Sequence, residues 1–479
     1  MRPFCQMKNR RVQFEPYHKN GRNMYRIFVF LAFLGVSSAA FAGEDPLDVT
    51  KPVERLPVES ICSQEIRGKK LTLPDVVNLA LCNNPQTRQS YLTAMSAAAD
   101  YGQAQGDYMP TVGLTAGLSQ SNTEYQKSSD RNTASANASL TLDWLLYDFG
   151  GRSAAVEKMK EALNMALFSR SDVLQSLIFD VTKAYYQLLA AEEEYKNSQA
   201  TVASAASAYD AASKRYELGL VALSDKLQAE TSYSQAQLTE AKAEEALALA
   251  KGHLAVLLNY PPQESFLLEP ADYTQAEEKF DGKVEEMLKI ALEKRADIIA
   301  KRAELKQALA NIEYEKSRNA PSFSVSGGLE ATDELRKAGE NDYATRVGLS
   351  MTVPLFTGFK NTYRITQSRY QAGKTTAELK KLENDVQSDV WDTFQTYQTA
   401  RKSYAISLTL FASAEQNEKV ALGAYKAGKG SMLNLLDAQS KLADARTSKS
   451  RSFYEMLIAK NNLIRTMGLI NPFKPKKGF

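Results

Sequence analysis

Two stretches of 64 residues, 153–216 and 362–425, limit the possible folds of this chain more than any other feature of its sequence. Neither contains proline, and apolar residues recur at helical spacing, as in Leu174, Leu177 and Val181. At a rise of 1.5 Å per residue, one helix of this length is roughly 95 Å long. Such a helix cannot fold back inside a compact globule, so the sequence predicts long helical rods.

The two stretches belong to a longer internal similarity. Segments 216–229 and 425–438 match at an offset of 209 residues. Four apolar residues of the first half recur at the same offset: Leu140, Leu142, Trp144 and Leu146 correspond to Leu349, Met351, Val353 and Leu355. A period of this size exceeds the roughly 20–50 residues of solenoid repeats. The chain is therefore predicted to consist of two tandem halves, 71–258 and 283–470.

A glycine-containing turn follows each long stretch, at 216–225 in the first half and at 425–434 in the second. Each turn leads into a further segment with helical periodicity. We expect each long helix to form an antiparallel hairpin with its successor, packed as in coiled coils. Cytoplasmic coiled-coil rods contain similar helices, but they need neither an export signal nor strand hairpins.

Each half also contains two segments in which apolar and polar residues alternate, which is the period of β-strands. These strands are expected at about 111–119, 137–147, 322–330 and 345–355. Transmembrane strands have this alternation and aromatic residues near their ends. Four strands cannot close a barrel, and lipid does not tolerate an open edge. Several chains must share one barrel if the strands span a membrane; soluble hairpins are the alternative.

The N-terminus has the pattern of an export signal. Basic residues up to Arg26 precede an apolar run at 27–34, and Ala40-Phe41-Ala42 follows as a cleavage site. The run is about half as long as a membrane-spanning helix. Residues 1–42 are therefore predicted to be a signal peptide, with a signal anchor as the alternative. Translation could start at Met1, Met7 or Met24.

Charge and cysteine content depend on this processing. The chain has 59 Lys and Arg against 56 Asp and Glu, but seven of the basic residues and one acid lie within 1–42. The mature chain is slightly acidic, so no nucleic-acid partner is predicted. Cys62 and Cys82 remain after Cys5 is removed. A pair in an exported protein suits a disulfide, and two unpaired buried thiols are the alternative.

The sequence gives little support for an enzyme, a cofactor or a metal site. His253 is the one histidine of the mature chain, so histidine-based triads and metal clusters are not expected. Gly373-Lys374-Thr375 matches part of a phosphate-binding loop. However, Ser368 replaces the upstream glycine, and the segment lies within a predicted helix. We expect energy for any transport to come from a partner.

These residues resemble the TolC-type outer membrane factors, the family of outer membrane efflux and type I secretion proteins. The resemblance covers residues 71–471 and depends on the order and spacing of short motifs. The motifs are Leu71-Thr72-Leu73-Pro74-Asp75 with Asn83-Asn84-Pro85, Tyr108-Met109-Pro110, Leu146-Tyr147-Asp148-Phe149-Gly150-Gly151-Arg152 and Gly219-Leu220-Val221-Ala222-Leu223-Ser224-Asp225. The cysteine pair and the third motif are most similar to the type I secretion branch.

The resemblance implies an α+β membrane protein that forms a homotrimer. Three chains with four strands each would share one barrel of twelve strands in outer membrane lipid, and their helical hairpins would form a periplasmic tunnel. Loops 121–136 and 331–342 would face outside the cell. Segment 43–70 would precede the first repeat, 259–282 would be an equatorial linker and 471–479 a C-terminal tail.

The implied function is that of an exit duct in the outer membrane of a Gram-negative bacterium. The duct would passively conduct the substrates of a tripartite efflux pump or a type I secretion system. Its partners would be a periplasmic adaptor and an inner-membrane transporter, either of the ABC type or driven by protons. The alternatives are an exported coiled-coil structural or adhesive protein without a pore, and a free-standing porin.

By the same resemblance, the hairpin turns form a periplasmic gate in which carboxylates ring the pore and favour cations. The residues at the matching positions are Ser224, Asp225, Tyr425, Lys429, Asn434 and Asp437. Asn434 replaces an acid that is frequent in the family. Gly430 replaces a base that could pair with Asp225, and Lys429 could take its place. Helix capping is the alternative role of Ser224 and Asp225.

The two turns are also expected to dock the adaptor tip to tip through small and apolar side chains. The residues proposed for docking are Gly219, Leu220, Val221, Ala222, Leu223, Gly428, Gly430, Ser431 and Met432. Two bare helix turns without a partner are the alternative.

Overall fold

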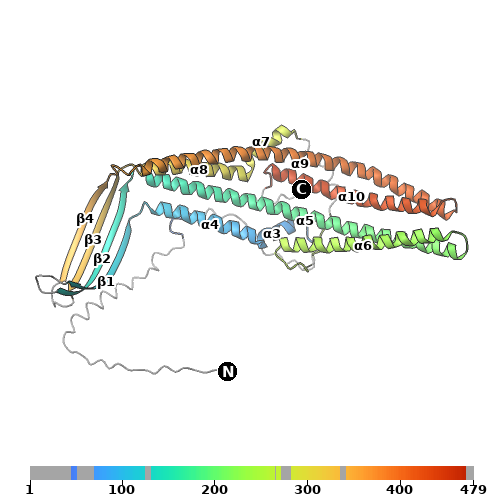
Figure 1. Cartoon of the computed structure of the whole chain (residues 1–479), viewed down its shortest axis with the longest axis horizontal. Coiled ribbons are helices and arrows are strands. Elements are labelled where there is room, and N and C mark those ends of the chain that lie inside the picture. Colours follow the sequence, from blue (N-terminus) through green and yellow to red (C-terminus); the bar gives the residue numbers. More distant parts are fainter. Residues whose placement is uncertain are drawn as a thin grey trace, which may run out of the picture. The chain divides into compact units, whose positions relative to one another are not determined.

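The structure, a computed structural model of the whole chain, describes residues 45–50, 70–123, 131–264, 266–270, 282–334 and 341–470. The chain divides into two compact units, Met1–Asp48 and Val49–Phe479, and every helix and strand below belongs to the second unit (Figure 1). The predicted signal peptide 1–42 and tail 471–479 lie outside the described residues. So do Cys62, most of 43–70 and about half of the linker 259–282.

In the part of the chain that the structure describes, each half contains two shorter helices, two strands and two longer helices. The first half contains α3 (Leu73–Asn83), α4 (Pro85–Gly106), β1 (Thr111–Thr123), β2 (Arg131–Tyr147), α5 (Gly151–Glu217) and α6 (Leu223–Leu257). The second contains α7 (Val284–Lys294), α8 (Ala296–Ser317), β3 (Ser322–Glu334), β4 (Asn341–Thr352), α9 (Lys360–Lys426) and α10 (Met432–Thr466).

The helices of the two halves have equal lengths in the same order. α3 and α7 have 11 residues, α4 and α8 have 22, α5 and α9 have 67, and α6 and α10 have 35. The strands differ more, because β2 has 17 residues and β4 has 12. Differences in length between the halves are therefore confined to strands and connections.

Residues from about 74 to 106 read in the sequence as one continuous helix that begins near Pro74, but the structure divides this segment in two. α3 starts with a capping box between Thr72 and Asp75, and it ends at Asn83. Asn84 then adopts an extended conformation and caps α4, accepting a hydrogen bond from the Gln86 amide (2.8 Å). Pro85 explains the break, because it disfavours helical geometry in the residue before it and suits the first position of a new helix.

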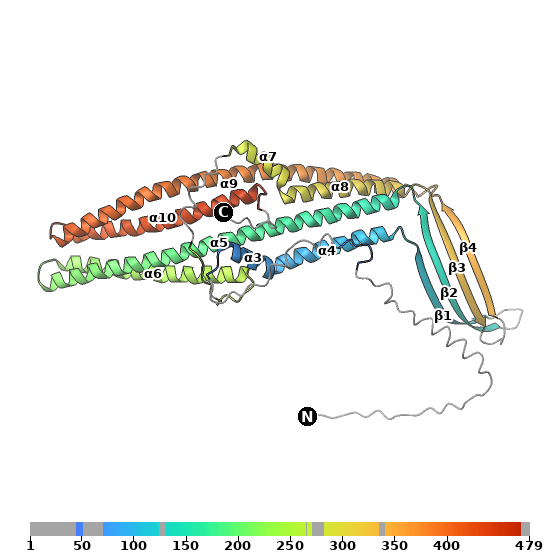
Figure 2. The same cartoon turned by 180° about the vertical axis from the view of Figure 1, so that it is seen from behind.

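The two long helices form hairpins with the helices that follow them. α5 and α9 extend the expected stretches by two residues at the start and one at the end. α6 returns along α5 and α10 along α9, and both hairpin turns lie far from the strands (Figures 1 and 2). In the described part of the chain, no helix is apolar over a length that could cross a membrane.

Glycines with left-handed backbone conformation end both long helices. Gly219 and Gly428 each have φ of +69°, which a residue without a side chain adopts at little cost. The Leu220 and Lys429 amides then donate to the carbonyls of Arg215 and Ala424. This arrangement satisfies carbonyls at the helix end that lack partners within the helix.

The four strands form one antiparallel sheet in the order β1-β2-β3-β4. β1 and β3 continue four residues beyond the expected ends, and β2 and β4 begin earlier than expected. β4 also ends at Thr352, not at residue 355. Pro354 explains the earlier end, since proline cannot donate a ladder hydrogen bond.

The main core lies among the helices, away from both the sheet and the hairpin turns. It is formed by residues of α3, α5, α6, α7, α8, α9 and α10, and it includes Phe453, Leu188 and Ile298. A much smaller core at the turns contains Ala212, Ala229, Tyr425, Met432 and Leu435.

Candidate functional site

The two faces of the sheet differ in polarity across all four strands. Paired residues point their side chains to the same face, and neighbours along a strand point to opposite faces. By the observed register, one face carries Val112, Leu114, Leu118, Leu140, Leu142, Trp144, Val325, Leu329, Val347, Leu349 and Met351. The other carries Thr111, Thr115, Ser119, Ser135, Ser139, Thr141, Asp143, Ser324, Ser326, Glu330, Arg346 and Ser350.

The sheet lies open at both edges within one chain. Among the residues that the structure describes, β1 pairs with β2 alone and β4 with β3 alone. The apolar face is also uncovered, with Val347 83% and Leu349 71% exposed. A sheet of this kind exposes unpaired backbone groups and a large apolar area, both of which mark an interaction surface.

Aromatic residues gather where the strands join the long helices. Tyr147 contacts Phe149 edge to face (4.7 Å between ring centroids), and Phe356 contacts Phe359 in the same way (5.5 Å). All four side chains are exposed. Exposed aromatic rings at one end of an apolar strand face are typical of a membrane interface.

Arg152 fixes the junction between β2 and α5. Its guanidinium donates to the carbonyls of Leu145 (2.6 Å) and Leu146 (2.8 Å) and lies over the Tyr108 ring (4.6 Å). Asp148 accepts from the Arg152 amide (2.7 Å). Asn361 takes the equivalent place in the first turn of α9 and donates to Asn319 Oδ1 (2.8 Å). Both junctions are therefore closed by a polar side chain in the first turn of the long helix.

The α5–α6 turn has the exposed apolar surface expected for docking. Gly219, Leu220, Ala222 and Leu223 are exposed, and Val221 is half-buried. Leu220 is 70% exposed. Leu218 was not among the predicted docking residues, yet it is 73% exposed, more than the other large apolar side chains of the turn.

The α9–α10 turn differs from the prediction at Met432. Gly428 and Ser431 are exposed and Gly430 is half-buried, but Met432 is only 1% exposed. The expectation that Met432 faces a partner is therefore wrong for the single chain. Its side chain fills the small core between the hairpins, and Leu433 is instead 63% exposed.

The capping role considered for Ser224 and Asp225 is also corrected. α6 begins at Leu223, and its cap residue, Ala222, makes no side-chain hydrogen bond. Ser224 and Asp225 thus lie inside the first turn, where the Asp225 carboxylate interacts favourably with the helix dipole. In the second half Ser431 is the cap and accepts from the Asn434 amide (3.2 Å).

The remaining gate candidates lie at or near the surface of the single chain. Asn434, Asp437 and Lys429 are exposed, and Asp437 pairs with Lys441 one turn later (2.7 Å). Asp225 is half-buried, and neither Asp225 nor Lys429 forms an ion pair with another residue of the described part of the chain. The substitution of Lys429 for the missing base, considered in the sequence analysis, therefore gives no ion pair with Asp225 inside one chain.

Tyr425 is the gate candidate with the most contacts. It is 4% exposed and packs in the core between the two turns. Arg215, which the sequence analysis missed, lies over its ring (4.5 Å from Cζ to the centroid) and donates to two carbonyls at the end of α9. The sequence hints at a special role for Arg215 in one way: the two halves differ here, since the residue 209 positions later is Ala424.

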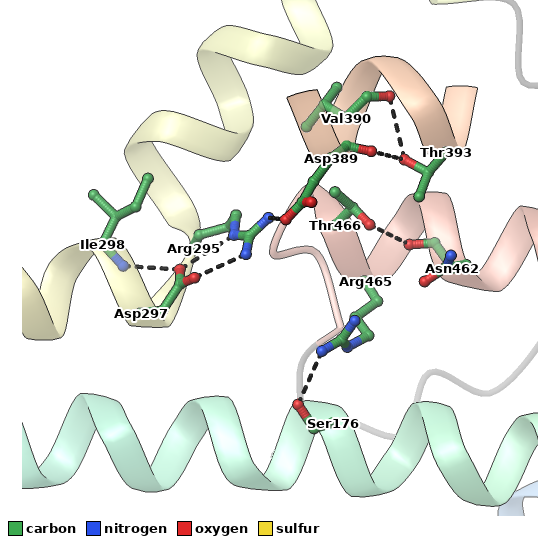
Figure 3. A network of polar contacts seen from close by, with 10 residues as sticks. All are labelled: Ser176, Arg295, Asp297, Ile298, Asp389, Val390, Thr393, Asn462, Arg465 and Thr466. Atoms are coloured by element: carbon green, nitrogen blue, oxygen red, sulfur yellow. Dashed lines mark hydrogen bonds and ion pairs between the residues drawn. The ribbon is translucent and has the colours of Figure 1, made fainter. Parts of the chain in front are cut away.

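A second polar cluster lies where α7 meets α8 (Figure 3). Arg295 donates to both carboxylate oxygens of Asp297 (3.1 and 2.8 Å) and to Asp389 of α9 (3.3 Å). Arg465 of α10 donates to Ser176 of α5 (3.2 Å). The first set of contacts links the start of α8 to α9, the second links α10 to α5, and Arg295, Asp389 and Arg465 line a cavity of about 200 Å³. Among the described residues, no three acidic, histidine or cysteine side chains are placed to hold a metal ion.

Asp172 of α5 lines this cavity, and its titration gives a test of the cluster. Burial, and then the nearby Asp297 carboxylate, raises the pKa of Asp172. The folded state thus holds this proton more tightly than the unfolded chain, so the ionised group destabilises the fold above the raised pKa. We expect Asp172→Asn to raise the melting temperature at pH 8 and to have little effect near pH 4, about the ordinary pKa of aspartate.

Thermal unfolding at the two pH values checks this expectation. Asp392→Asn is the matched control, because Asp392 lines the same cavity from an exposed position on α9. The control should leave the melting temperature unchanged. An equal rise in melting temperature from Asp172→Asn at pH 8 and at pH 4 would contradict the assignment of the effect to ionisation of Asp172.

Cys82 lies on α3 and is disulfide-bonded. Cys62, its predicted partner, lies outside the described residues. The pairing of Cys62 with Cys82 therefore stays a prediction.

Comparison with known proteins decides the family. The model of the family described as outer membrane efflux protein matches residues 76–260 and 287–469. The chain belongs to this family. The resemblance inferred from the sequence motifs is thereby confirmed, and so are the outer membrane location and the role as an efflux or secretion channel. The family is one of channel proteins and not of enzymes.

Relatives in the outer membrane efflux protein family match over most of their length. Protein CyaE of Bordetella pertussis is 28% identical over 380 residues, which is 78% of this chain and 79% of CyaE. Outer membrane protein TolC of Escherichia coli is 23% identical, with 83% of this chain and 82% of TolC covered. The CmeC outer membrane channel of Campylobacter jejuni shares the fold, with a TM-score of 0.73 at 17% identity over 85% of this chain and 87% of CmeC.

Proposed function

We propose that three copies of this chain form one duct, with a single shared barrel of twelve strands in the outer membrane. The sheet supports this proposal most directly, because it is apolar on one face, polar on the other and unpaired at both edges. In lipid every backbone group needs a partner. Joining β4 of one copy to β1 of the next closes the edges and turns the apolar face outward to lipid.

The helices support a tunnel below this barrel. Equal helix lengths in the two halves give each chain two similar hairpins, and three chains would supply six around one axis. We propose that the hairpins line the periplasmic part of the duct and that their turns form its inner end. Asp225 and Asp437 would place carboxylates there in three copies, a field that favours cations.

The partners we propose are a periplasmic adaptor and an inner-membrane transporter, ABC-type or proton-driven. Support comes from the exposed apolar residues of the α5–α6 turn, which suit contact with a helical tip of another protein. The chain then serves as the passive exit of a tripartite efflux pump or a type I secretion system.

The mass of the purified protein in detergent and its conductance in planar lipid bilayers test this function. We expect a trimer that inserts and conducts weakly, because the proposed gate is closed in the absence of partners. A monomer that never conducts would support an exported structural or adhesive coiled-coil protein. A channel that is open at all times would support a free-standing porin.

A further inference from the structure

Val49, the first residue of the second unit, contacts α4 close to the end that leads into β1. Val49 and Thr50 are both half-buried. A Cβ atom built on Gly102 of α4 would lie only 3.0 Å from Cγ2 of Val49. A side chain at position 102 would therefore crowd Val49, because protein interiors leave no spare room at such contacts. Gly102 forms a notch in α4, and the Val49 side chain fills it.

The chain is held a second time at the start of α3. The Leu71 amide donates to the Leu267 carbonyl (2.8 Å), and the Leu71 carbonyl accepts from the Glu269 amide (3.0 Å). α3 leads into the end of α4 that lies away from the strands (Figure 1). Residues 51–70 therefore connect points at opposite ends of α4. Twenty residues span at most about 66 Å, whereas α4 with its 22 residues is roughly 33 Å long.

A groove on α4 lies between these two points. It has a volume of about 580 Å³, and its surface is largely apolar. Its described lining consists of Pro85, Arg88, Gln89, Leu92, Thr93 and Ser96. Leu92 is 51% exposed, although it is a large apolar side chain. Arg88 and Gly102 are 14 residues apart, which is nearly four helical turns, so both lie near one side of α4. The side of the helix that holds Val49 thus continues into the groove.

The sequence of the connection suits an extended chain in such a groove. Residues 51–61 read Lys-Pro-Val-Glu-Arg-Leu-Pro-Val-Glu-Ser-Ile, and the two prolines favour an extended conformation over a helix. Apolar residues recur at every second or third position: Val53, Leu56, Val58 and Ile61. One side of an extended chain is then apolar. Glu54 and Glu59 lie between these residues and carry charge opposite to that of Arg88 in the groove.

We propose that residues 51–61 form a strap that docks in the α4 groove of the same chain, with its apolar side against Leu92. The strap begins in the notch and follows α4 toward α3. Cys82 lies three residues before Pro85 and is disulfide-bonded. Its predicted pairing with Cys62 would hold the end of the strap beside the groove. This inference goes beyond the proposed channel function and does not depend on it.

A second copy of the chain is the other candidate occupant of the groove. The strap is favoured because it is held at both ends, by Val49 at the notch and by Leu71 at the start of α3. A segment tethered by short flexible connections meets its site at an effective concentration of about millimolar. A second copy must first associate, so the strap fills the groove before copies assemble.

Photocrosslinking of the full-length protein in outer membranes shows which segment lies in the groove. Leu92→p-benzoylphenylalanine should link to a peptide within residues 51–61 and leave the chain at the mass of a monomer on denaturing gels. The same probe in place of Leu309 on α8, which is 50% exposed, is the matched control and should give no link to residues 51–61. A link from position 92 to a second copy, seen as a band of twice the mass, would overturn the proposal. So would the absence of any link to residues 51–61.

The rate of trypsin cleavage after Arg55 measures how firmly the strap is docked. Arg55 lies in the middle of the strap, and proteolysis follows the population of the open form when opening and closing are fast. Leu92→Glu puts a charge where the apolar side of the strap docks, so cleavage should become about tenfold faster. Leu309→Glu is the control and should leave the rate unchanged. Equal acceleration by both variants would contradict docking at Leu92.

An exchange of side-chain volume tests the notch with the same cleavage assay. Gly102→Ala adds a methyl group that crowds Val49 and should speed cleavage after Arg55 severalfold. Val49→Ala removes two methyl groups, so the double variant should regain protection. Gly106→Ala is the control, since nothing lies within 4 Å of a Cβ atom built on Gly106. If the double variant is cut as fast as Gly102→Ala, the notch does not hold Val49 and the proposal fails.

Helix content by circular dichroism shows whether Leu92→Glu and Gly102→Ala fold. If either variant does not fold, the photocrosslink from position 92 decides the question, because it is measured in a chain with both the notch and the strap intact.

Discussion

Arginine in place of Val347 is expected to prevent assembly in the outer membrane. Val347 is 83% exposed on the apolar face of the sheet, in the middle of β4. An arginine that faces lipid near the bilayer midplane costs about 2–4 kcal/mol per chain, and the proposed trimer would bear this cost three times. The amount of trimer in outer membrane fractions should fall by at least about tenfold, measured by blotting of unheated gel samples.

Ser350→Arg is the matched control for this variant. Ser350 lies three residues further along β4 on the polar face, where it hydrogen-bonds to Ser324 (2.8 Å). An arginine there would face water inside the proposed barrel, on the same face of the sheet as Arg346. Trimer yield should stay near that of the wild type. Equal losses from both variants would show that the two faces have been assigned wrongly.

The second large effect is expected from alanine in place of Gly468. Gly468 follows α10 with φ of +68°, and a Cβ atom there would lie 2.9 Å from both Cα and N of Arg295. The close approach is to backbone, so no side chain can rotate away. We expect Gly468→Ala to destabilise the fold by about 2–6 kcal/mol, from unfavourable φ and overpacking together.

Gly428→Ala isolates the contribution of the close approach. Gly428 has almost the same φ, +69°, but nothing lies within 4 Å of a Cβ atom built on it. This variant should lose only the conformational part, about 1 kcal/mol. Melting temperatures of both variants in detergent check the difference. If the melting temperatures of the two variants fall equally, the contact between the end of α10 and the α7–α8 junction does not contribute to stability.

The long helices could be predicted closely because their signal is local. An apolar period of 3.6 residues without proline leaves few alternatives, and the glycines at 219 and 428 mark the ends. The break between α3 and α4 at Asn84 also has a signal in the sequence, which is Pro85. It was missed because a proline in an alanine-rich helical segment can either kink a helix or begin one.

The strand ends were harder to predict from the sequence. The far ends of β1 and β2 consist mostly of serine, asparagine and threonine, which alternate weakly or not at all. Pairing with the neighbouring strand keeps them extended, and this pairing is a tertiary effect that overrides local preference. The prediction therefore ended where the apolar alternation ended.

At the hairpin tips, the sequence indicated which segments matter but not which side chains are buried. Met432 belongs to a turn and is apolar, so exposure and burial were equally consistent with its position. Its burial depends on Ala212 and Ala229, which lie in the other hairpin. Arg215 was missed for a different reason: its partners are carbonyls, which every residue has, so the contact leaves no pattern in the sequence.

The open edges of the sheet have a consequence for inheritance as well as for structure. In the proposed barrel, β4 of one copy pairs with β1 of another. A chain with a damaged edge strand therefore inactivates the intact chains with which it assembles, because the barrel cannot close. In a cell that makes normal and damaged chains in equal amounts, most rings would contain at least one damaged member. Lesions in β1 or β4 should therefore behave as dominant, whereas lesions that prevent a chain from folding at all should be recessive.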